Sequence, residues 1–363
     1  MMFTLLAETY KDSVPFRKHL VTYLKEQDIL HSPSIESALL MIPREAFVPV
    51  FFHTNAQSLS TSTLWITFDT THPDYSSQVY QDQPLITHLN SYGMPDSSSS
   101  MPSVMVQMLE ALDIQSNHTV LEIGTGTGYN AALIAYLAAG CTTIDREPAY
   151  VEQVHQIIQH FHLDAIRTYI ADGVKGYPEY APYDRIIVTA STPLIPMAWV
   201  DQLHAGGRLV CDLAGPLARA FLILDKIHHE MVNGLFLPIM LNFMPMQSDL
   251  LPHIQYSRFP KIVPMQEIQL DDDSISMIHD LLGSHSFRWF LQWHQRHIKL
   301  QQLIAPEKAH VLLIAPDERS YIDFSRVFLL MISLLGKQCS IRRMRSILRS
   351  GIMSYNLIRF GEN

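Results

Sequence analysis

The sequence predicts an α/β protein with a doubly wound sheet, and two observations support this fold class. From about residue 118, short β-branched runs alternate with amphipathic stretches, and the runs are apolar enough to be buried on both faces of a sheet. Three closely spaced glycines follow the first of these runs and precede an Ala/Leu-rich stretch. This order is typical of a Rossmann-like ligand-binding turn between a strand and a helix.

The expected elements follow in order along this part of the chain. The expected strands are HTVLEIG (118–124), TTID (142–145), IRTYIAD, DRIIVTA and GRLVCDLA. The expected helices are 128–140, 147–162 and the stretch IPMAWVDQL. Pro148 suits the first turn of the second helix, where its missing N–H group costs nothing.

The regions on either side of this core differ in character. Residues 1–50 are amphipathic and predicted to be helical, whereas residues 51–95 are polar, rich in turn formers and without a clear assignment. A proline-rich stretch at 245–262 marks a change in composition. We therefore predict an N-terminal helical segment with an insertion (1–78), a core (79–245) and a C-terminal accessory α/β domain (246–363).

Composition narrows the class of protein. The chain has 363 residues, of which 47% are hydrophobic, so it can bury one large core or two smaller ones. Its net charge of -9 argues against a nucleic-acid partner. The three cysteines, Cys141, Cys211 and Cys339, form no CxxC motif, which favours a reducing compartment without disulfides or a zinc ribbon. No long apolar segment is present, so we expect a cytoplasmic protein without a membrane partner.

The glycine-rich turn VLEIGTGTGYNAAL (120–133) carries the strongest chemical signal. Its glycines, Gly124, Gly126 and Gly128, let the backbone approach a ligand, and the helix that follows offers free N–H groups. A dinucleotide motif would require glycine where Tyr129 stands. The GxGxG spacing, preceded by Glu122, instead suits S-adenosylmethionine, which has no pyrophosphate.

Two acidic residues follow at the ends of the next two expected strands. Asp145 is placed to accept hydrogen bonds from ribose hydroxyls, and Asp172 from the adenine amino group, with Gly173 keeping the backbone close. Each feature has a structural alternative, since a GxGxG segment can be a tight turn and a strand-end aspartate can be a helix cap. Their combined order favours the cofactor site.

Residues 20 to 210 resemble the protein-L-isoaspartate O-methyltransferase family. The segments that carry the resemblance are IPREAFVPV (42–50), VYQDQPL (79–85), the serine tract before Pro102, VLEIGTGTGYNAAL, ADGVKGYPEYAPYDRIIVTA (171–190) and IPMAWVDQLHAGGRLV (195–210). The resemblance implies a carboxyl O-methyltransferase that uses S-adenosylmethionine and releases S-adenosylhomocysteine.

Site residues are implied by the same resemblance. Ser100 corresponds to the family's active-site serine and is our candidate catalytic residue. The candidate cofactor-binding residues are Ser97, Ser98, Ser99, Glu122, Gly124, Thr125, Gly126, Thr127, Gly128, Asp145, Arg146, Asp172 and Gly173. No metal site is expected, because the histidines of 147–162 lack the i, i+4 spacing of a metal-binding pair.

Methyl transfer to a carboxylate requires little from the enzyme beyond placement. An aspartyl carboxylate, with a pKa of about 3.9, is ionised at neutral pH and needs no general base. The expected role of Ser100 is therefore to donate a hydrogen bond that orients the attacking oxygen in a site that excludes water.

Three features depart from a simple repair enzyme: the long polar stretch 51–78, the sequence MPSVMVQMLEALDI after the serines, and the continuation of the chain to residue 363. The stretches THLNSYGMPDSSSSMPSVMVQMLEAL (87–112) and GTGTGYNAALIAYL (124–137) most resemble the family branch associated with ribosomally synthesised peptides such as lanthipeptides and graspetides, whose enzymes carry such a C-terminal extension. We therefore hypothesise methylation of an aspartate in a precursor or modified peptide, which leads to aspartimide (succinimide) or isoaspartate.

Two alternatives stay open. One is an isoaspartyl repair methyltransferase that acts on damaged proteins, and the other is a peptide-binding module that binds S-adenosylmethionine without catalysis. The aromatic and basic stretch SFRWFLQWHQRH (286–297) is predicted to be a core helix or, alternatively, part of a peptide-binding surface. The oligomeric state is not predicted.

Overall fold

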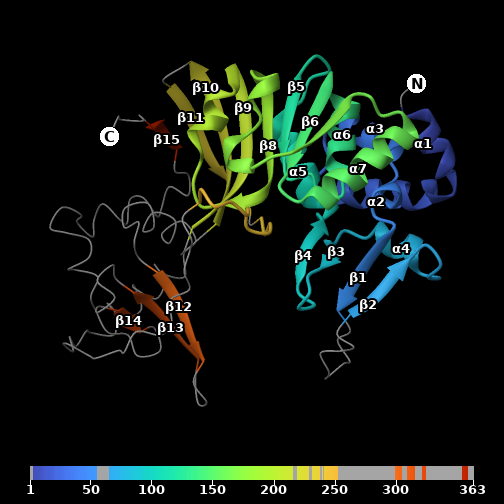
Figure 1. Ribbon diagram of the computed structural model, residues 1–363, viewed down its shortest axis with the longest axis horizontal. Coiled ribbons are helices and arrows are strands. Elements are labelled where there is room, and N and C mark those ends of the chain that lie inside the picture. The colour runs from blue at the N-terminus through green and yellow to red at the C-terminus, as the bar shows by residue number, and fades with distance from the viewer. Residues whose placement is uncertain are drawn as a thin grey trace.

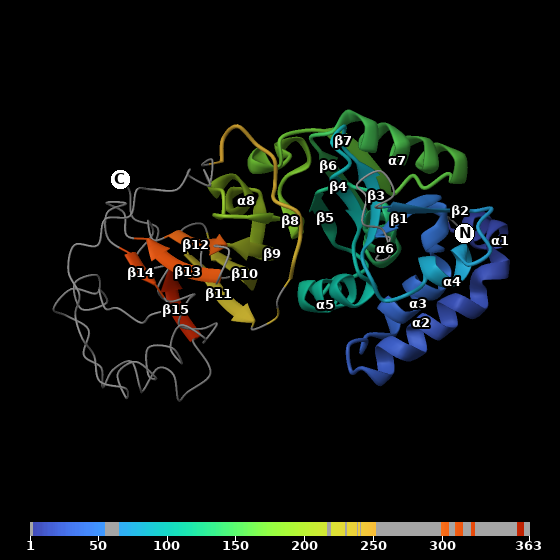
Figure 2. The same cartoon turned by 90° about the horizontal axis from the view of Figure 1, so that it is seen from below.

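A computed structural model describes residues 3–54, 65–215, 219–228, 231–237, 239 and 241–251, together with four strands beyond them. Two sheets dominate residues 3–251 (Figures 1 and 2). One is the large sheet predicted from the sequence. The other is a smaller sheet built from the region 50–99, for which the sequence gives no clear assignment.

The large sheet has eight strands in the order β15-β11-β10-β9-β8-β5-β6-β7. Five neighbouring strands are parallel, and β9, β10, β11 and β15 pair antiparallel. The strands are β5 (Thr119–Ile123), β6 (Gly140–Asp145), β7 (Ile166–Ile170), β8 (Tyr183–Thr192), β9 (Leu203–Ala214), β10 (Arg219–His228), β11 (Met231–Leu237) and β15 (Ser354–Ile358). This arrangement confirms the α/β class and adds an antiparallel half.

Both faces of this sheet are buried, as the apolar strands predict. Val120 and Ile187 belong to one hydrophobic cluster, whereas their chain neighbours Leu121 and Ile186 belong to a second cluster. This alternation places successive side chains on opposite faces. The antiparallel strands β10 and β11 differ from the expected strand-helix alternation, because antiparallel neighbours need no crossover helix.

Helices cover the sheet. The first cluster packs against α5 (Pro102–Leu112), α6 (Tyr129–Leu137), α7 (Pro148–Phe161) and the N-terminal helices α1 (Thr4–Thr9), α2 (Val14–Glu26) and α3 (Pro33–Met41), and the second packs against α8 (Met197–Asp201). In α7 the predicted Pro148 does occupy the first turn, and the Glu147 side chain accepts from the Ala149 N–H at 3.4 Å. The helix ends at Phe161, and the capping residue His162 has a left-handed φ of 54°.

The smaller sheet is antiparallel and has the order β2-β1-β3-β4. Its strands are β1 (Val50–Thr54), β2 (Trp65–Asp69), β3 (Leu85–Leu89) and β4 (Pro95–Ser99), with α4 (Tyr75–Val79) between the second and third. Pairing of Phe52 with Ile86 joins segments on both sides of residue 78. The three-part division of the chain stays a prediction. Its first boundary, at residue 78, falls between two strands of this one sheet.

Beyond residue 251 the structure describes β12 (Lys299–Ile304), β13 (Ala309–Ile314) and β14 (Tyr321–Asp323), which form an antiparallel sheet, and β15 at the edge of the large sheet. The stretch 286–297, considered above as a peptide-binding surface, lies outside the described residues. Within the described part of the chain, no helix is long and apolar enough to cross a membrane.

Candidate active site

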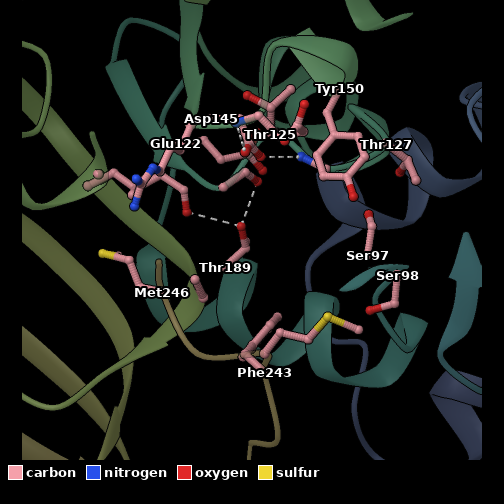
Figure 3. Close-up of a pocket in the computed structure, with 18 of the residues that line it drawn as sticks. Ser97, Ser98, Glu122, Thr125, Thr127, Asp145, Tyr150, Thr189, Phe243 and Met246 are labelled. Atoms are coloured by element: carbon pink, nitrogen blue, oxygen red, sulfur yellow. Dashed lines mark hydrogen bonds between the residues drawn. The ribbon is translucent and has the colours of Figure 1, made fainter. Parts of the chain in front are cut away.

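A pocket of about 600 Å³ lies where the glycine turn, the serine strand β4 and the carboxyl ends of β5, β6 and β8 meet (Figure 3). Strand carboxyl ends are the usual ligand-binding edge of such a sheet. The predicted site residues that line the pocket are Ser97, Ser98, Ser99, Ser100, Glu122, Gly124, Thr125, Gly126, Thr127, Asp145, Arg146 and Gly173. Gly128 and Asp172 are sequence neighbours of lining residues but do not line the pocket themselves.

The turn between β5 and α6 requires its glycines. Gly124 has a φ of 108°, and a Cβ atom there would lie 2.6 Å from Thr189 Oγ1. Gly128 has a φ of 81°, and its Cβ would lie 2.7 Å from Val154. Both positions therefore exclude a side chain by backbone conformation and by space. Gly128 does not line the pocket, but its lack of a side chain allows the start of α6 to pack closely against Val154 of α7.

Glu122 is held beneath this turn. It is 1% exposed, and its two carboxylate oxygens accept from Asn130 Nδ2 at 2.7 Å and from Thr143 Oγ1 at 2.6 Å. Burial raises its pKa to about 7, against the lowering effect of these two hydrogen bonds. Thr143 also lies 2.9 Å from Thr125 Oγ1. Glu122 thus connects β5, β6 and α6 at the base of the pocket.

Asp145 ends β6 and faces the turn. Its Oδ2 atom accepts from the Gly126 N–H at 3.1 Å, and its Oδ1 atom accepts from the Glu147 N–H at 3.0 Å. Each carboxylate oxygen retains a second lone pair for a ligand. Burial raises the pKa of Asp145. The neighbouring Arg146 lines the pocket and lies 3.4 Å from Asp249 Oδ2.

Asp172 and Gly173 follow shortly after β7, at the start of a short 3-10 helix (Gly173–Lys175). The Asp172 carboxylate accepts from the Val174 N–H at 3.1 Å and from the Ser248 hydroxyl at 2.7 Å. A Cβ atom on Gly173 would lie 2.7 Å from Ile123 Cγ2, and its carbonyl accepts from Trp199 Nε1 at 2.7 Å. Asp172 therefore acts as a helix cap in this structure, and its contact with adenine stays a prediction.

The serine tract belongs to strand β4 as far as Ser99, and Ser100 follows directly after it. Ser97 and Ser99 are buried, and β4 pairs with β3. Arg44, which is 0% exposed, donates to Ser99 Oγ at 3.2 Å and to the carbonyl oxygens of Ser99 and Ser100 at 3.2 and 2.8 Å. Its guanidinium also donates to the carbonyls of Val79, Gln81 and Gln83.

Sequence reasoning did not assign Arg44 to the site. Its signal was present in the IPREAFVPV segment, which served only as a family marker. Burial lowers the pKa of Arg44 to about 10. The guanidinium joins the segment after α4 to the end of the serine strand and so fixes the backbone of the candidate catalytic residue.

Tyr150 and Asp96 also line the pocket without having been predicted. Tyr150, from α7, points toward Ser97 across the upper part of the pocket (Figure 3). Its hydroxyl lies 3.5 Å from Asp96 Oδ1, which is 2.5 Å from His88 Nδ1. Burial and the nearby Asp96 raise the pKa of Tyr150 to about 12. Nothing in the pattern of the helix 147–162 distinguishes this tyrosine from its neighbours.

A second unpredicted part of the wall is residues 243–249, which we call the strap. Backbone hydrogen bonds attach it to β8: Ser191 N–H donates to Met244 O at 2.9 Å, and Met246 N–H donates to Ser191 O at 2.8 Å. Phe243 and Met246 line the pocket (Figure 3). Because the strap is distant in sequence from the glycine turn, only the fold brings the two together.

The pocket suits a cationic nucleoside such as S-adenosylmethionine. Its lining includes five carboxylates, and Arg146 is the one lysine or arginine among the lining residues; the carboxylates are Asp96, Glu122, Asp145, Glu147 and Asp249. Such a lining favours a positively charged ligand. The turn glycines leave space that side chains would fill. Among the described residues, no group of histidine, cysteine and acidic side chains could hold a metal ion.

Residues 16–234 match the protein-L-isoaspartate(D-aspartate) O-methyltransferase (PCMT) family. The protein-L-isoaspartate O-methyltransferase of Staphylothermus marinus is 32% identical over 227 residues, which are 60% of this chain and 88% of the relative. The enzyme of the same name from Azorhizobium caulinodans is 45% identical over 117 residues, 32% of this chain and 54% of the relative.

A solved structure of a protein-L-isoaspartate O-methyltransferase has a TM-score of 0.53 and 23% identity, covering 82% of this chain and 84% of that one. This likeness supports the fold. Fold and pocket together define a class I methyltransferase that depends on S-adenosylmethionine. The match over residues 16–234 goes further, and the chain belongs to the protein-L-isoaspartate O-methyltransferase family of carboxyl methyltransferases. The family resemblance found in the sequence is thereby confirmed.

Proposed function

We propose that the protein methylates the carboxylate of an isoaspartyl residue in a peptide chain. The observation that carries this proposal is a single pocket lined by both the glycine turn and the serine strand. One wall suits the cofactor, and the serine hydroxyls suit a carboxylate. The relatives in Staphylothermus marinus and Azorhizobium caulinodans are named for the same reaction.

The residues of the pocket have separate roles in this proposal. The glycine turn and Asp145 bind the cofactor, which when bound supplies a methyl group on a positively charged sulfur. The Ser100 hydroxyl orients the substrate oxygen, and Arg44 holds the Ser100 backbone in place. The substrate carboxylate is ionised at neutral pH, so orientation and exclusion of water are the main requirements.

The product explains why methylation leads to rearrangement of the peptide. Methoxide is a better leaving group than oxide, so the nitrogen of the next peptide bond can attack the methyl ester. The attack closes a five-membered succinimide, and the nitrogen's proton leaves with methoxide as methanol. Hydrolysis of the ring then gives aspartate or isoaspartate.

A second candidate substrate is an ordinary aspartate in a ribosomally synthesised precursor peptide. The observation in its favour is that the family match ends at residue 234 while the chain continues to residue 363 with further strands, β12 to β15. These additional residues supply surface outside the family match with which one precursor sequence would be recognised. In this case the partner is a precursor or modified peptide.

Mass spectrometry of matched peptides separates these substrates. Each peptide is prepared with aspartate and with isoaspartate at the same position and incubated with S-adenosylmethionine. Methylation of isoaspartyl versions of unrelated sequences supports the first proposal, and methylation of aspartate in one precursor sequence supports the second. Binding of the cofactor with no methylation of any peptide would instead indicate a binding module and contradict both.

A further inference from the structure

The strap is attached at its two ends by different contacts. At its C-terminal end, Ser248 donates to Asp172 at 2.7 Å and Asp249 lies 3.4 Å from Arg146. Both of these partners are candidate cofactor-binding residues. At its N-terminal end, the backbone of Phe243 is hydrogen-bonded to two other residues, Asp212 and Arg219. The two ends of the strap are therefore held by different sets of residues.

Phe243 is held by an ion pair. Its N–H donates to Asp212 Oδ2 at 3.3 Å, and its carbonyl accepts from Arg219 Nη1 at 3.3 Å. The same Nη1 atom lies 3.0 Å from Asp212 Oδ2. Asp212 is on β9, which contains the predicted strand GRLVCDLA, and Arg219 is on its antiparallel neighbour β10, which the sequence did not predict. Both polar groups of one peptide residue are thus fixed by two charged side chains.

This ion pair is poorly suited to a purely stabilising role. Asp212 is 0% exposed, and its Oδ1 atom has no hydrogen-bond partner in the described part of the chain. A buried carboxylate with an unpartnered oxygen carries a desolvation cost that apolar residues would avoid. What the pair supplies, and apolar residues could not, is a defined position for the backbone of Phe243.

The position of Phe243 indicates what the pair serves. Phe243 lies at the opposite end of the pocket from Asp145 and Thr125, the expected ribose side (Figure 3). Phe243 is one of the lining residues, as Ser98 and Ser100 are, and with 8% exposure it packs into the hydrophobic core at this side of the pocket. The N-terminal end of the strap therefore borders the space left for the substrate, and the C-terminal end borders the cofactor.

We propose that Asp212 and Arg219 are positioning residues that fix Phe243 at the substrate end of the pocket and thereby determine which peptides are accepted. This inference rests on the proposed carboxyl methyl transfer to a peptide. Loss of the pair displaces the apolar wall against which the residues flanking the methylated carboxylate pack. Cofactor binding, which depends on the other end of the strap, is left intact.

The test uses the whole 363-residue chain with Arg219→Met, Arg219→Lys and Asp212→Asn. The KM for the peptide should rise about tenfold in Arg219→Met, as expected for loss of charged hydrogen bonds, and Arg219→Lys should recover part of it. The Kd for S-adenosylmethionine, measured by calorimetry, should stay within about twofold. Arg219 is the main variant because it is partly exposed, so its loss is better tolerated than loss of buried Asp212.

Two matched variants complete the design. Arg208→Met breaks an ion pair between the same two strands, Arg208–Asp225 at 2.7 Å, whose residues do not line the pocket, and should leave both constants unchanged. Ser248→Ala removes the hydrogen bond to Asp172 at the other end of the strap and should weaken the binding of the cofactor more than the binding of the peptide.

The outcomes distinguish this inference from the function on which it rests. An active wild-type protein whose peptide KM is unchanged in Arg219→Met overturns the positioning role alone. Equal weakening of peptide and cofactor shows general damage and also overturns it. Peptide binding is measured in parallel by calorimetry with S-adenosylhomocysteine bound, and a wild-type protein that neither binds nor methylates any peptide overturns both proposals.

Discussion

The guanidinium of Arg44 lies 2.8 Å from the carbonyl oxygen of Ser100, although the two residues are 56 positions apart in the chain. The same side chain contacts both the hydroxyl and the carbonyl of Ser99. A fully buried cation thus holds the last two serines of the tract through their backbone. The relationship explains how a stretch of small polar residues becomes a defined wall of the pocket.

Replacing Arg44 should destabilise the protein. In Arg44→Met the carbonyl groups of both bound segments lose their donor, and we expect the free energy of unfolding to fall by about 3–5 kcal/mol. Arg44→Lys should cost less because the ammonium keeps three donors. Urea unfolding checks both values, with exposed Arg167 changed to Met for comparison. Equal stability of Arg44→Met and wild type would contradict the assigned role.

Ser100→Ala should slow methyl transfer without changing cofactor affinity. The Ser100 hydroxyl makes no hydrogen bond to any described residue, so it is available to the substrate oxygen. Loss of one such hydrogen bond predicts a fall in kcat of about tenfold. Single-turnover kinetics and calorimetry measure the two effects separately, and exposed Ser91→Ala is the control. An unaltered rate would remove Ser100 from the mechanism.

Asp145→Ala should weaken the binding of S-adenosylmethionine. The carboxylate lines the pocket and also accepts from the Gly126 N–H, so its loss removes a ligand contact and loosens the turn. We expect the Kd to rise by about 10–100-fold, the range for charged hydrogen bonds. Calorimetry with Asp164→Ala, an exposed aspartate, provides the comparison. If the affinity does not change, Asp145 does not bind the cofactor.

Glu122 should make stability fall as pH rises. The pKa of Glu122 is about 7 in the folded protein, against 4.5 for an unburied glutamate. Between pH 4.5 and 7 the folded state therefore keeps a proton on Glu122 that the unfolded chain has lost. The resulting loss in the free energy of unfolding is absent below pH 4.5 and reaches about 3 kcal/mol above pH 7. Glu122→Gln should therefore show a flatter profile of unfolding free energy between pH 4.5 and 7.5.

The control for this profile is Glu26→Gln, an exposed residue whose replacement should leave the slope unchanged. Urea unfolding at several pH values gives the comparison. Parallel profiles for wild type and Glu122→Gln would show that burial does not raise the pKa of the Glu122 carboxyl group.

The core of the site could be predicted because its signals are local. The glycines at 124 and 128 are required by the backbone of one turn, and Asp145 follows at the end of the next strand. Strand-helix alternation then places both at the same edge of the sheet. Arg44, by contrast, carried a recognisable motif but no local reason to contact Ser100, and its role depends on packing between distant segments.

The sequence by itself determined the α/β class, the cofactor turn and the family, because strand periodicity, glycine spacing and short motifs act within a few residues of each other. Tertiary structure alone decided that the serine tract belongs to a strand and that Ser248 donates a hydrogen bond to Asp172. It also decided that the strap forms one wall of the pocket. These contacts join segments far apart in the chain. Their formation depends on burial and hydrogen bonding across the whole fold, which no local pattern records.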